Sequence, residues 1–174
     1  DACSAPLKRL FAPVVADDLL TQRANELVKH QSDRLESLGY KTQIYPREIN
    51  FFYMKAGLRE RIVHAGGHFE VVGTDIRWSE QDLLVELETF PERFSPNVVM
   101  RPLYQEVILP NIAYLGGPAE VAYWFQLKSV FDHYQVDYPA VMPRNFGMII
   151  PKVASRKIEA LGLSTVDLFK SFDE

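Results

Sequence analysis

The stretch that decides the fold is residues 111–143, NIAYLGGPAEVAYWFQLKSVFDHYQVDYPAVMP. It opens with a short apolar run, residues 111–115, that predicts a buried strand. Two glycines and a proline follow, and residues 119–133 then have the apolar spacing of a helix. Residues 138–143 predict a second strand, which we expect to be parallel to the first because a helix connects the two. The stretch therefore predicts a βαβ unit.

A different pattern precedes this unit. Residues 41–73 contain short β-type runs that are separated by proline and glycine. This is typical of an antiparallel meander, and the two runs that flank Gly66 and Gly67 predict a hairpin. Residues 92–97 are expected to form a loop. The fold class predicted from the residues is thus α/β, with one parallel βαβ unit and an antiparallel β insert.

Helices are expected on both sides of the meander. The longest is predicted between a cap at Asp17 or Asp18 and a stop at Gly39, because side-chain oxygens satisfy free N–H groups at helix starts and glycine is usual after helix ends. Another helix begins at the cap Ser79, and a third covers residues 98–109.

Composition limits the class of protein. The chain has 174 residues, 47% hydrophobic and 24% charged, which is ordinary for a folded globular protein. Its net charge of −4 argues against a nucleic-acid-binding surface. No apolar run approaches the ~20 residues that span a bilayer, so no membrane association is expected. Cys3 is the single cysteine, which favours a reducing, cytoplasmic setting. The four histidines are scattered, and no metal site is predicted.

The Gly116-Gly117 turn is the first candidate site. A turn without side chains between a strand and a helix start can approach a ligand closely, and free N–H groups there favour an anion. The same glycines also suit a plain connection. Glu120 either compensates the helix dipole or orients an amine. Tyr123 either packs at the rim of the core or contacts a ligand, and Gln126 is expected to be solvated.

The second candidate site precedes the first in the chain. Arg101 and Gln105 are spaced i, i+4 and share one helical face, with Asn97 just before them. An arginine and an amide together can hold a carboxylate or a phosphate. The alternative is an ordinary helix surface on which Arg101 pairs with Glu106 or another acid. Arg144, at the end of a predicted strand, is a further cation in a position that favours function.

Four segments carry a family resemblance. Residues 95–110 (SPNVVMRPLYQEVILP), 113–124 (AYLGGPAEVAYW), 126–128 (QLK) and 139–144 (PAVMPR) together resemble the cysteine-adding enzyme family of bacillithiol biosynthesis, BshC. The stretch LESLGY, residues 35–40, also fits.

The resemblance implies a Rossmann-like core, similar to class I aminoacyl-tRNA synthetases, in a longer protein with a coiled coil that supports a homodimer. Residues 1–40 would then be a helical segment of the core and residues 41–78 an antiparallel β-meander insert. Residues 79–174 would be an α/β core segment with the Gly-Gly turn. The chain starts with Asp1. We therefore expect an internal piece, with the first Rossmann half before it.

The resemblance also implies a reaction. Family members join L-cysteine to glucosaminyl malate through an amide, and ATP is the expected cofactor because the carboxyl needs activation. Carried over to this chain, the residues with catalytic roles are Glu120, Arg101 and Gln105. The substrate-binding residues are Asn97, Gly116, Gly117, Tyr123 and Arg144. Glu120 would hold the cysteine amine, and Arg101 or Arg144 a carboxylate or phosphate.

Two other functions stay open from the sequence. One is a non-catalytic small-molecule-binding or scaffold module. The other is a nucleotidyltransferase-like domain that uses the same glycine turn. Flanking sequence that completes a Rossmann half would favour the ligase, whereas a nucleotide-phosphate loop in the flanks would favour the nucleotidyltransferase.

Overall fold

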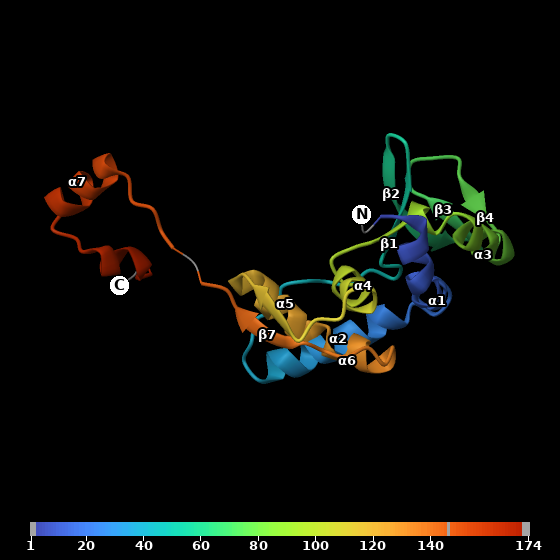
Figure 1. Ribbon diagram of the computed structural model, residues 1–174, viewed down its shortest axis with the longest axis horizontal. Helices are drawn as coiled ribbons and strands as arrows, with labels where there is room; N and C mark the ends of the chain where they lie inside the picture. The colour runs from blue at the N-terminus through green and yellow to red at the C-terminus, as the bar shows by residue number, and fades with distance from the viewer. Residues whose placement is uncertain (1–2, 146, 172–174) are drawn as a thin grey trace. The chain divides into compact units, whose positions relative to one another are not determined.

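The computed structural model describes residues 3–145 and 147–171. The chain divides into two compact units, Asp1–Arg144 and Asn145–Glu174, shown in Figure 1. The first unit contains the antiparallel sheet and the predicted βαβ unit. The second contains α7 (Lys152–Ala160) and the short 3-10 helix η2 (Thr165–Phe169).

The N-terminal helices differ from the prediction in where they break. Helix α1 (Ala5–Thr21) runs through Pro13, and Gln22, with a φ of 55°, separates it from α2 (Arg23–Ser37). The expected helix start at Asp17 or Asp18 is wrong, because both lie inside α1. The carboxylate of Asp18 instead accepts the backbone N–H of Asn50 at 3.0 Å in a buried position. It therefore ties α1 to the segment that enters the sheet.

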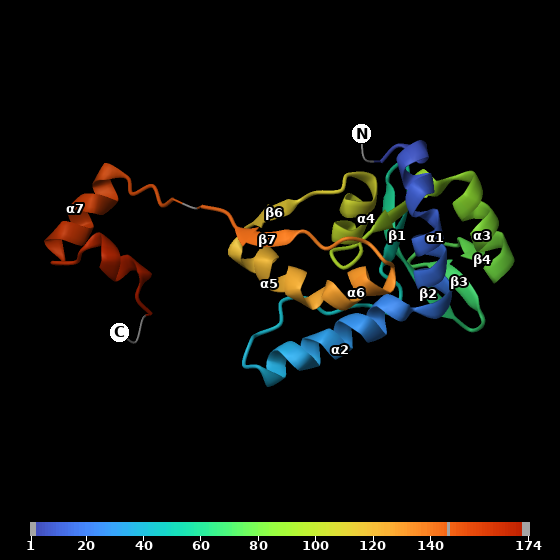
Figure 2. The same cartoon turned by 60° about the horizontal axis from the view of Figure 1, so that its bottom comes forward.

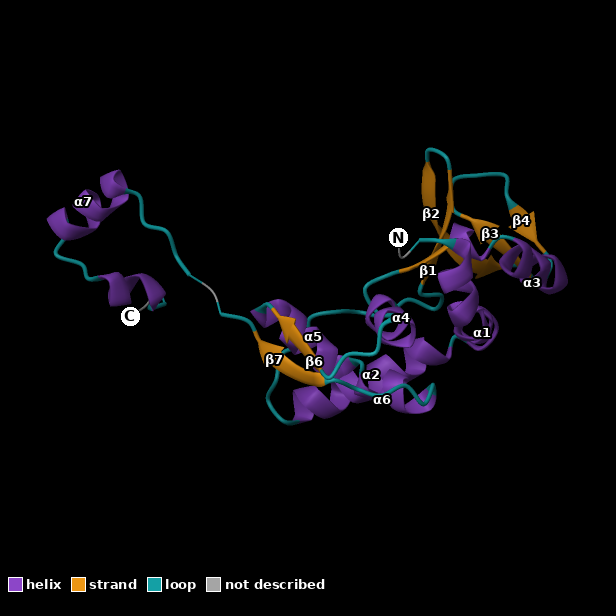
Figure 3. Ribbon diagram, in the orientation of Figure 1, coloured by secondary structure: helices purple, strands orange, loops and turns teal. Residues whose placement is uncertain are grey.

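The antiparallel meander is confirmed from residue 51 onward (Figure 3), whereas residues 41–50 form no strand and the prediction is wrong there. Its strands are β1 (Phe51–Lys55), β2 (Leu58–Ala65), β3 (His68–Val71), β4 (Arg77–Trp78) and β5 (Phe94–Pro96), in the order β4-β3-β2-β1-β5. Gly66 and Gly67, with φ of 59° and 82°, form the two-residue hairpin turn between β2 and β3. The loop expected at residues 92–97 is wrong in part, since β5 pairs with β1 through Phe52 and Ser95.

Two further helices pack near this sheet. Helix α3 (Glu80–Thr89) begins at Ser79, whose hydroxyl accepts the N–H of Asp82 at 3.2 Å, as predicted. The 3-10 helix η1 (Pro91–Arg93) and α4 (Arg101–Ile108) follow. The largest fully buried side chains of α1, the sheet, α3 and α4 are Tyr53, Phe11, Phe51, Phe94, Leu19, Ile62, Leu83 and Leu103.

The βαβ unit is also confirmed. Strands β6 (Ala113–Gly116) and β7 (Ala140–Pro143) are parallel, and α5 (Pro118–Gln126) and α6 (Lys128–His133) connect them. Helix α2 lies alongside α5 and α6 (Figure 2). The first strand is less buried than expected. Tyr114 faces α5, where it stacks on Trp124, so the next residue, Leu115, points to the other face and is 63% exposed.

Candidate functional site

The Gly116-Gly117 turn places β6 against the start of α5, and packing requires glycine at position 116 more strictly than at position 117. A Cβ on Gly116 would lie 2.9 Å from Cε1 of Tyr114 and 3.1 Å from Cβ of Glu120. A Cβ on Gly117 would lie 3.2 Å from Nη2 of Arg144. The φ of Gly117 is −67°, an ordinary value, and its nearest neighbour is the mobile end of Arg144, so glycine is favoured there but not required.

Glu120 closes the turn. Its Oε2 accepts the backbone N–H of Gly117 at 2.8 Å, and its Oε1 accepts the hydroxyl hydrogen of Tyr114 at 3.0 Å. The hydrogen bonds from Gly117 and Tyr114, and the charges of Arg144 and Arg101, lower the pKa of Glu120. The side chain is therefore an ionised carboxylate at neutral pH. A carboxylate offers about four acceptor positions, so two remain for a further donor.

These contacts narrow one expectation about the turn, which is that the helix start offers free N–H groups to an anion. The N–H of Gly117 is taken by Glu120 and Pro118 has none, so these two residues offer no N–H group to an anion. The local charge that this turn presents is thus the carboxylate of Glu120, which favours a cationic group such as an amine.

Arg101 is held on two sides. Its Nη1 donates to Oε1 of Gln105 at 3.1 Å, and its Nη2 donates to the hydroxyl of Tyr123 at 3.0 Å. Burial opposes the charged form, yet the hydrogen bond to Tyr123 and the nearby Tyr114 raise the pKa of Arg101. Arg101 and Gln105 therefore share one face of α4, as predicted, and the arginine reaches across to α5.

Glu106 is not the partner of Arg101. It is 2% exposed, and its carboxylate accepts the backbone N–H of Asn111 at 2.8 Å and the amide of Gln105 at 3.0 Å. Glu106 thus fixes the segment between α4 and β6. It also orients Gln105, which in turn contacts Arg101. Nothing in the local pattern except its place on the helix predicts that this acid is buried.

Asn97 sets the position of α4. Its Oδ1 accepts the N–H of Val99 at 2.8 Å, and its Nδ2 donates to Oδ1 of Asn50 at 3.0 Å. Its carbonyl accepts the N–H of Arg101 at 2.9 Å. These bonds join the end of β5 to the helix that carries Arg101 and Gln105.

Arg144 meets the turn from the end of β7. Its backbone N–H donates to the carbonyl of Gly116 at 2.8 Å, and its exposed guanidinium lies over Gly117. The structure therefore brings Gly116, Gly117, Glu120 and Arg144 into one cluster. Arg101, which contacts Gln105 and Tyr123, lies close enough for its charge to help lower the pKa of Glu120. We call these residues and Tyr114 the turn cluster.

Tyr114 was missed in the sequence. It stacks on Trp124 with ring centroids 4.2 Å apart and donates to Glu120. Burial and the neighbouring Glu120 raise the pKa of Tyr114, which therefore stays a neutral donor. The sequence could have indicated this role, because Tyr114 is two residues before Gly116 on a strand and so lies on the same face, toward the helix.

Gln126 is not solvated as expected. The side chain has no exposed surface. Its Oε1 accepts the N–H groups of Gln43 and Ile44 at 2.8 and 3.1 Å, and its Nε2 donates to Ser32 at 2.8 Å and to the carbonyl of Ile44 at 2.9 Å. It therefore holds the segment after α2 against α5.

A hollow of about 420 Å³ lies beside the start of α5. Its walls are mainly apolar and come from Leu35, Tyr40, Lys41, Pro118, Val121, Ala122 and Phe125. Pro118 directly follows the turn, whereas none of the predicted site residues lines this hollow. It adds apolar surface next to the turn cluster.

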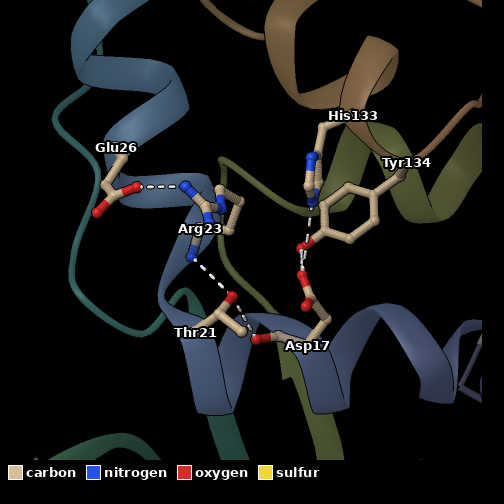
Figure 4. A network of polar contacts seen from close by, with 6 residues as sticks. All are labelled: Asp17, Thr21, Arg23, Glu26, His133 and Tyr134. Atoms are coloured by element: carbon tan, nitrogen blue, oxygen red, sulfur yellow. Dashed lines mark hydrogen bonds and ion pairs between the residues drawn. The ribbon is translucent and has the colours of Figure 1, made fainter.

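A separate polar network joins α6 to the junction of α1 and α2 (Figure 4). Oδ2 of Asp17 accepts the hydroxyl hydrogen of Tyr134 at 2.8 Å and lies 3.7 Å from Nε2 of His133. Arg23, at the start of α2, pairs with Glu26 at 2.7 Å. The contacts of Asp17 connect residues far apart in the chain and support the packing of α6 against α1, whereas the Arg23–Glu26 pair lies within α2.

Among residues 3–145 and 147–171, no group of three or more histidine, cysteine, aspartate or glutamate side chains is placed to hold a metal ion. Over the same residues, every helix is too short or too polar to span a bilayer.

The chain was compared with known proteins. Residues 1–145 match the family model described as "Bacillithiol biosynthesis BshC, N-terminal Rossmann-like domain", which confirms the expected Rossmann-like fold. Proteins named "Putative cysteine ligase BshC" are similar to it. Those of Flavobacterium psychrophilum and Cytophaga hutchinsonii are 43% and 44% identical over 97% and 98% of the chain. That of Bacillus pumilus is 35% identical over 94%. The chain spans 32%, 33% and 30% of these relatives' lengths.

Proposed function

The chain belongs to the BshC family of bacillithiol biosynthesis, and on this premise we propose that it forms part of a ligase that adds L-cysteine to glucosaminyl malate. The relatives are named as cysteine ligases, and the chain spans about a third of their length. The activity therefore belongs to the whole protein, which we propose to be a cytoplasmic homodimer. The family match argues against the non-catalytic module and the nucleotidyltransferase-like domain as functions of the whole protein.

The observation that best supports this proposal is the ionised carboxylate of Glu120 next to two arginines. An α-amino acid has an ammonium group and a carboxylate on one carbon. Glu120 keeps acceptor positions for the ammonium, while Arg144 has an exposed guanidinium for the carboxylate or for a phosphate. The turn cluster thus matches the charges of free L-cysteine.

Each residue has a proposed part in this binding. Glu120 receives the cysteine ammonium, and the lowered pKa of its carboxyl suits a charged acceptor better than a general base. Arg101 is fixed by Gln105 and Tyr123 and holds a carboxylate or phosphate. Gly116 and Gly117 keep side chains out of the turn, so that the arginine and the carboxylate can lie close together.

The chemistry that these groups would serve is amide formation. The amine of glucosaminyl malate attacks the activated carboxyl carbon of cysteine and a C–N bond forms. The C–O bond to the activating group breaks, that group leaves with one carboxyl oxygen, and the amine nitrogen releases a proton to solvent. ATP, when bound, would supply the activation. An exposed arginine such as Arg144 fits a phosphate of such a cofactor, because guanidinium matches phosphate with paired donors.

The experiment is product formation by the full-length protein, measured by mass spectrometry with L-cysteine, glucosaminyl malate and ATP. Glu120→Gln keeps the shape of the side chain but removes its charge. We expect kcat/KM for L-cysteine to fall by at least about tenfold, since a charge-assisted hydrogen bond contributes roughly 1.5–3 kcal/mol. Glu60→Gln, an exposed change on β2, is the matched control and should leave the rate unchanged. Equal activity of Glu120→Gln and the wild type would contradict the proposal.

A further inference from the structure

A second hollow, of about 320 Å³, lies between α2, residues 46–49 and β2. It is unlike the apolar hollow beside α5, because three cations line it: Lys29 from α2, Arg47 from the connecting segment and Arg61 from β2. One acid, Glu48, lies on the same wall. The chain therefore places a net positive charge around one small space, although its overall net charge is −4.

These cations differ from others in the same unit. Arg93 pairs with Glu86 at 2.7 Å, and Arg77 lies 3.6 Å from Glu70. Within the described residues, no acid lies within ion-pair distance of Lys29, Arg47 or Arg61. Like charges that face one space repel each other, and a bound anion would offset that repulsion.

The wall that carries Arg47 is fixed by buried polar side chains. Nδ2 of Asn25 donates to the carbonyl of Pro46 at 3.2 Å. Asn50, which has no exposed surface, accepts the N–H of Arg47 at 3.1 Å and donates to its carbonyl at 2.9 Å. Arg61 lies on a strand with a neighbour on each side, where it pairs with Phe52 of β1. The backbone of the hollow is therefore ordered before any ligand binds.

From this geometry we infer that the hollow binds the phosphate group of a small molecule. Two guanidinium groups offer paired planar donors, and the lysine adds a point charge, a set that suits a tetrahedral dianion. A space of 320 Å³ is near the lower end of the roughly 300–1,000 Å³ range of small-molecule sites. Glu48 and the negative net charge disfavour a nucleic acid strand. The site shares no residue with the turn cluster and does not depend on the proposed ligase function.

The test is calorimetric titration of the full-length protein with inorganic phosphate and, in a second arm, with glycerol 3-phosphate. Both are run against sodium chloride of equal ionic strength, because exposed charges respond to salt alone. We expect one saturable site, with a Kd of about millimolar or tighter. Tighter binding of glycerol 3-phosphate assigns the site to a phosphate ester, whereas tighter binding of inorganic phosphate assigns it to the free anion. Both outcomes support the inference.

Matched variants decide whether the hollow is responsible. Arg47→Gln and Arg61→Gln should each weaken binding by at least about fivefold. Arg59→Gln removes the same charge from the same strand, but Arg59 covers the ring of Phe52 at 3.9 Å and does not line the hollow. It should bind as the wild type does. All positions are exposed, and circular dichroism checks the fold. Absence of saturable heat, or equal weakening by Arg59→Gln, would overturn the inference.

Discussion

The guanidinium of Arg101 donates a hydrogen bond to the hydroxyl of Tyr123 at 3.0 Å, and this contact joins α4 to α5 across the turn cluster. Gln105 holds the same guanidinium from within α4 at 3.1 Å. The direction of the arginine is therefore set by its own neighbours before a substrate arrives, which is what an accurate binding group requires.

Tyr123→Phe tests this positioning. The ring stays in place and only the hydroxyl is lost, so Arg101 keeps Gln105 as its partner but gains freedom. In the full-length protein we expect kcat/KM to fall by about fivefold, in line with the loss of roughly 1 kcal/mol for one hydrogen bond. The unfolding temperature should change by only a few degrees. An unchanged kcat/KM would show that the hydrogen bond to Arg101 is structural only.

The two glycines of the turn should respond differently to alanine. Gly116→Ala places a Cβ 2.9 Å from the ring of Tyr114, which is itself stacked on Trp124, so the ring has little room to move. We expect a loss of about 1–3 kcal/mol in unfolding free energy, as for other overpacked sites. At Gly117 the nearest atom is the mobile end of Arg144, at 3.2 Å, and the cost should stay below about 1 kcal/mol. Urea unfolding of both variants measures whether Gly116→Ala loses more unfolding free energy than Gly117→Ala. Equal losses would contradict the prediction.

Gln126 should be among the most sensitive buried positions. Gln126→Leu keeps the approximate volume but leaves the N–H groups of Gln43 and Ile44 without their acceptor. An unsatisfied buried donor costs about 1–3 kcal/mol, so we expect a loss of roughly 2–5 kcal/mol. Gln31→Leu is the control, since Gln31 makes one exposed contact with the carbonyl of Phe125. If the two variants unfold at the same urea concentration, the buried network contributes little.

Asp18 makes stability depend on pH. Burial raises the pKa of Asp18 from 3.8 to about 6, despite the hydrogen bond from Asn50. The folded state then binds the proton more tightly than the unfolded chain does. The contribution of Asp18 to the free energy of unfolding is therefore most favourable below about pH 4, falls as pH rises to about 6, and is level above that. At neutral pH the cost is on the order of 3 kcal/mol.

Asp18→Asn removes this titration and keeps an oxygen for the N–H of Asn50. We expect the variant to be more stable than the wild type at pH 7, with a difference that shrinks as pH is lowered to 4. Asp17 and its partners His133 and Tyr134 are unchanged in the comparison. Unfolding free energies at several pH values measure the difference. A constant difference between pH 4 and 7 would contradict the assigned cause.

The sequence predicted the features that depend on local pattern. The parallel pairing of β6 and β7 followed from the helix between two apolar runs, and the hairpin followed from Gly66 and Gly67. Ser79 was correctly placed as a helix cap. Arg101 and Gln105 were placed on one face because their spacing fits a helical turn.

The features that were missed depend on residues far apart in the chain. Strand β5 has three residues and exists because β1, about forty residues earlier, pairs with it. The local pattern predicts Gln126 as a surface residue, because its hydrogen-bond partners Ser32 and Ile44 are far from it in the sequence. Asp18 is predicted as a helix cap because aspartate is a common capping residue. Its carboxylate instead accepts the N–H of Asn50, which is in another segment. No local pattern records such contacts.

The central claim is that Glu120 receives the amine of L-cysteine, and ligand binding tests it most directly. Calorimetric titration of the full-length protein would compare L-cysteine with 3-mercaptopropionate, which lacks only the amine, for the wild type and for Glu120→Gln. We predict that the wild type binds L-cysteine at least about tenfold more tightly than its analogue, and that Glu120→Gln removes this preference. A preference for L-cysteine that persists in Glu120→Gln would contradict the claim.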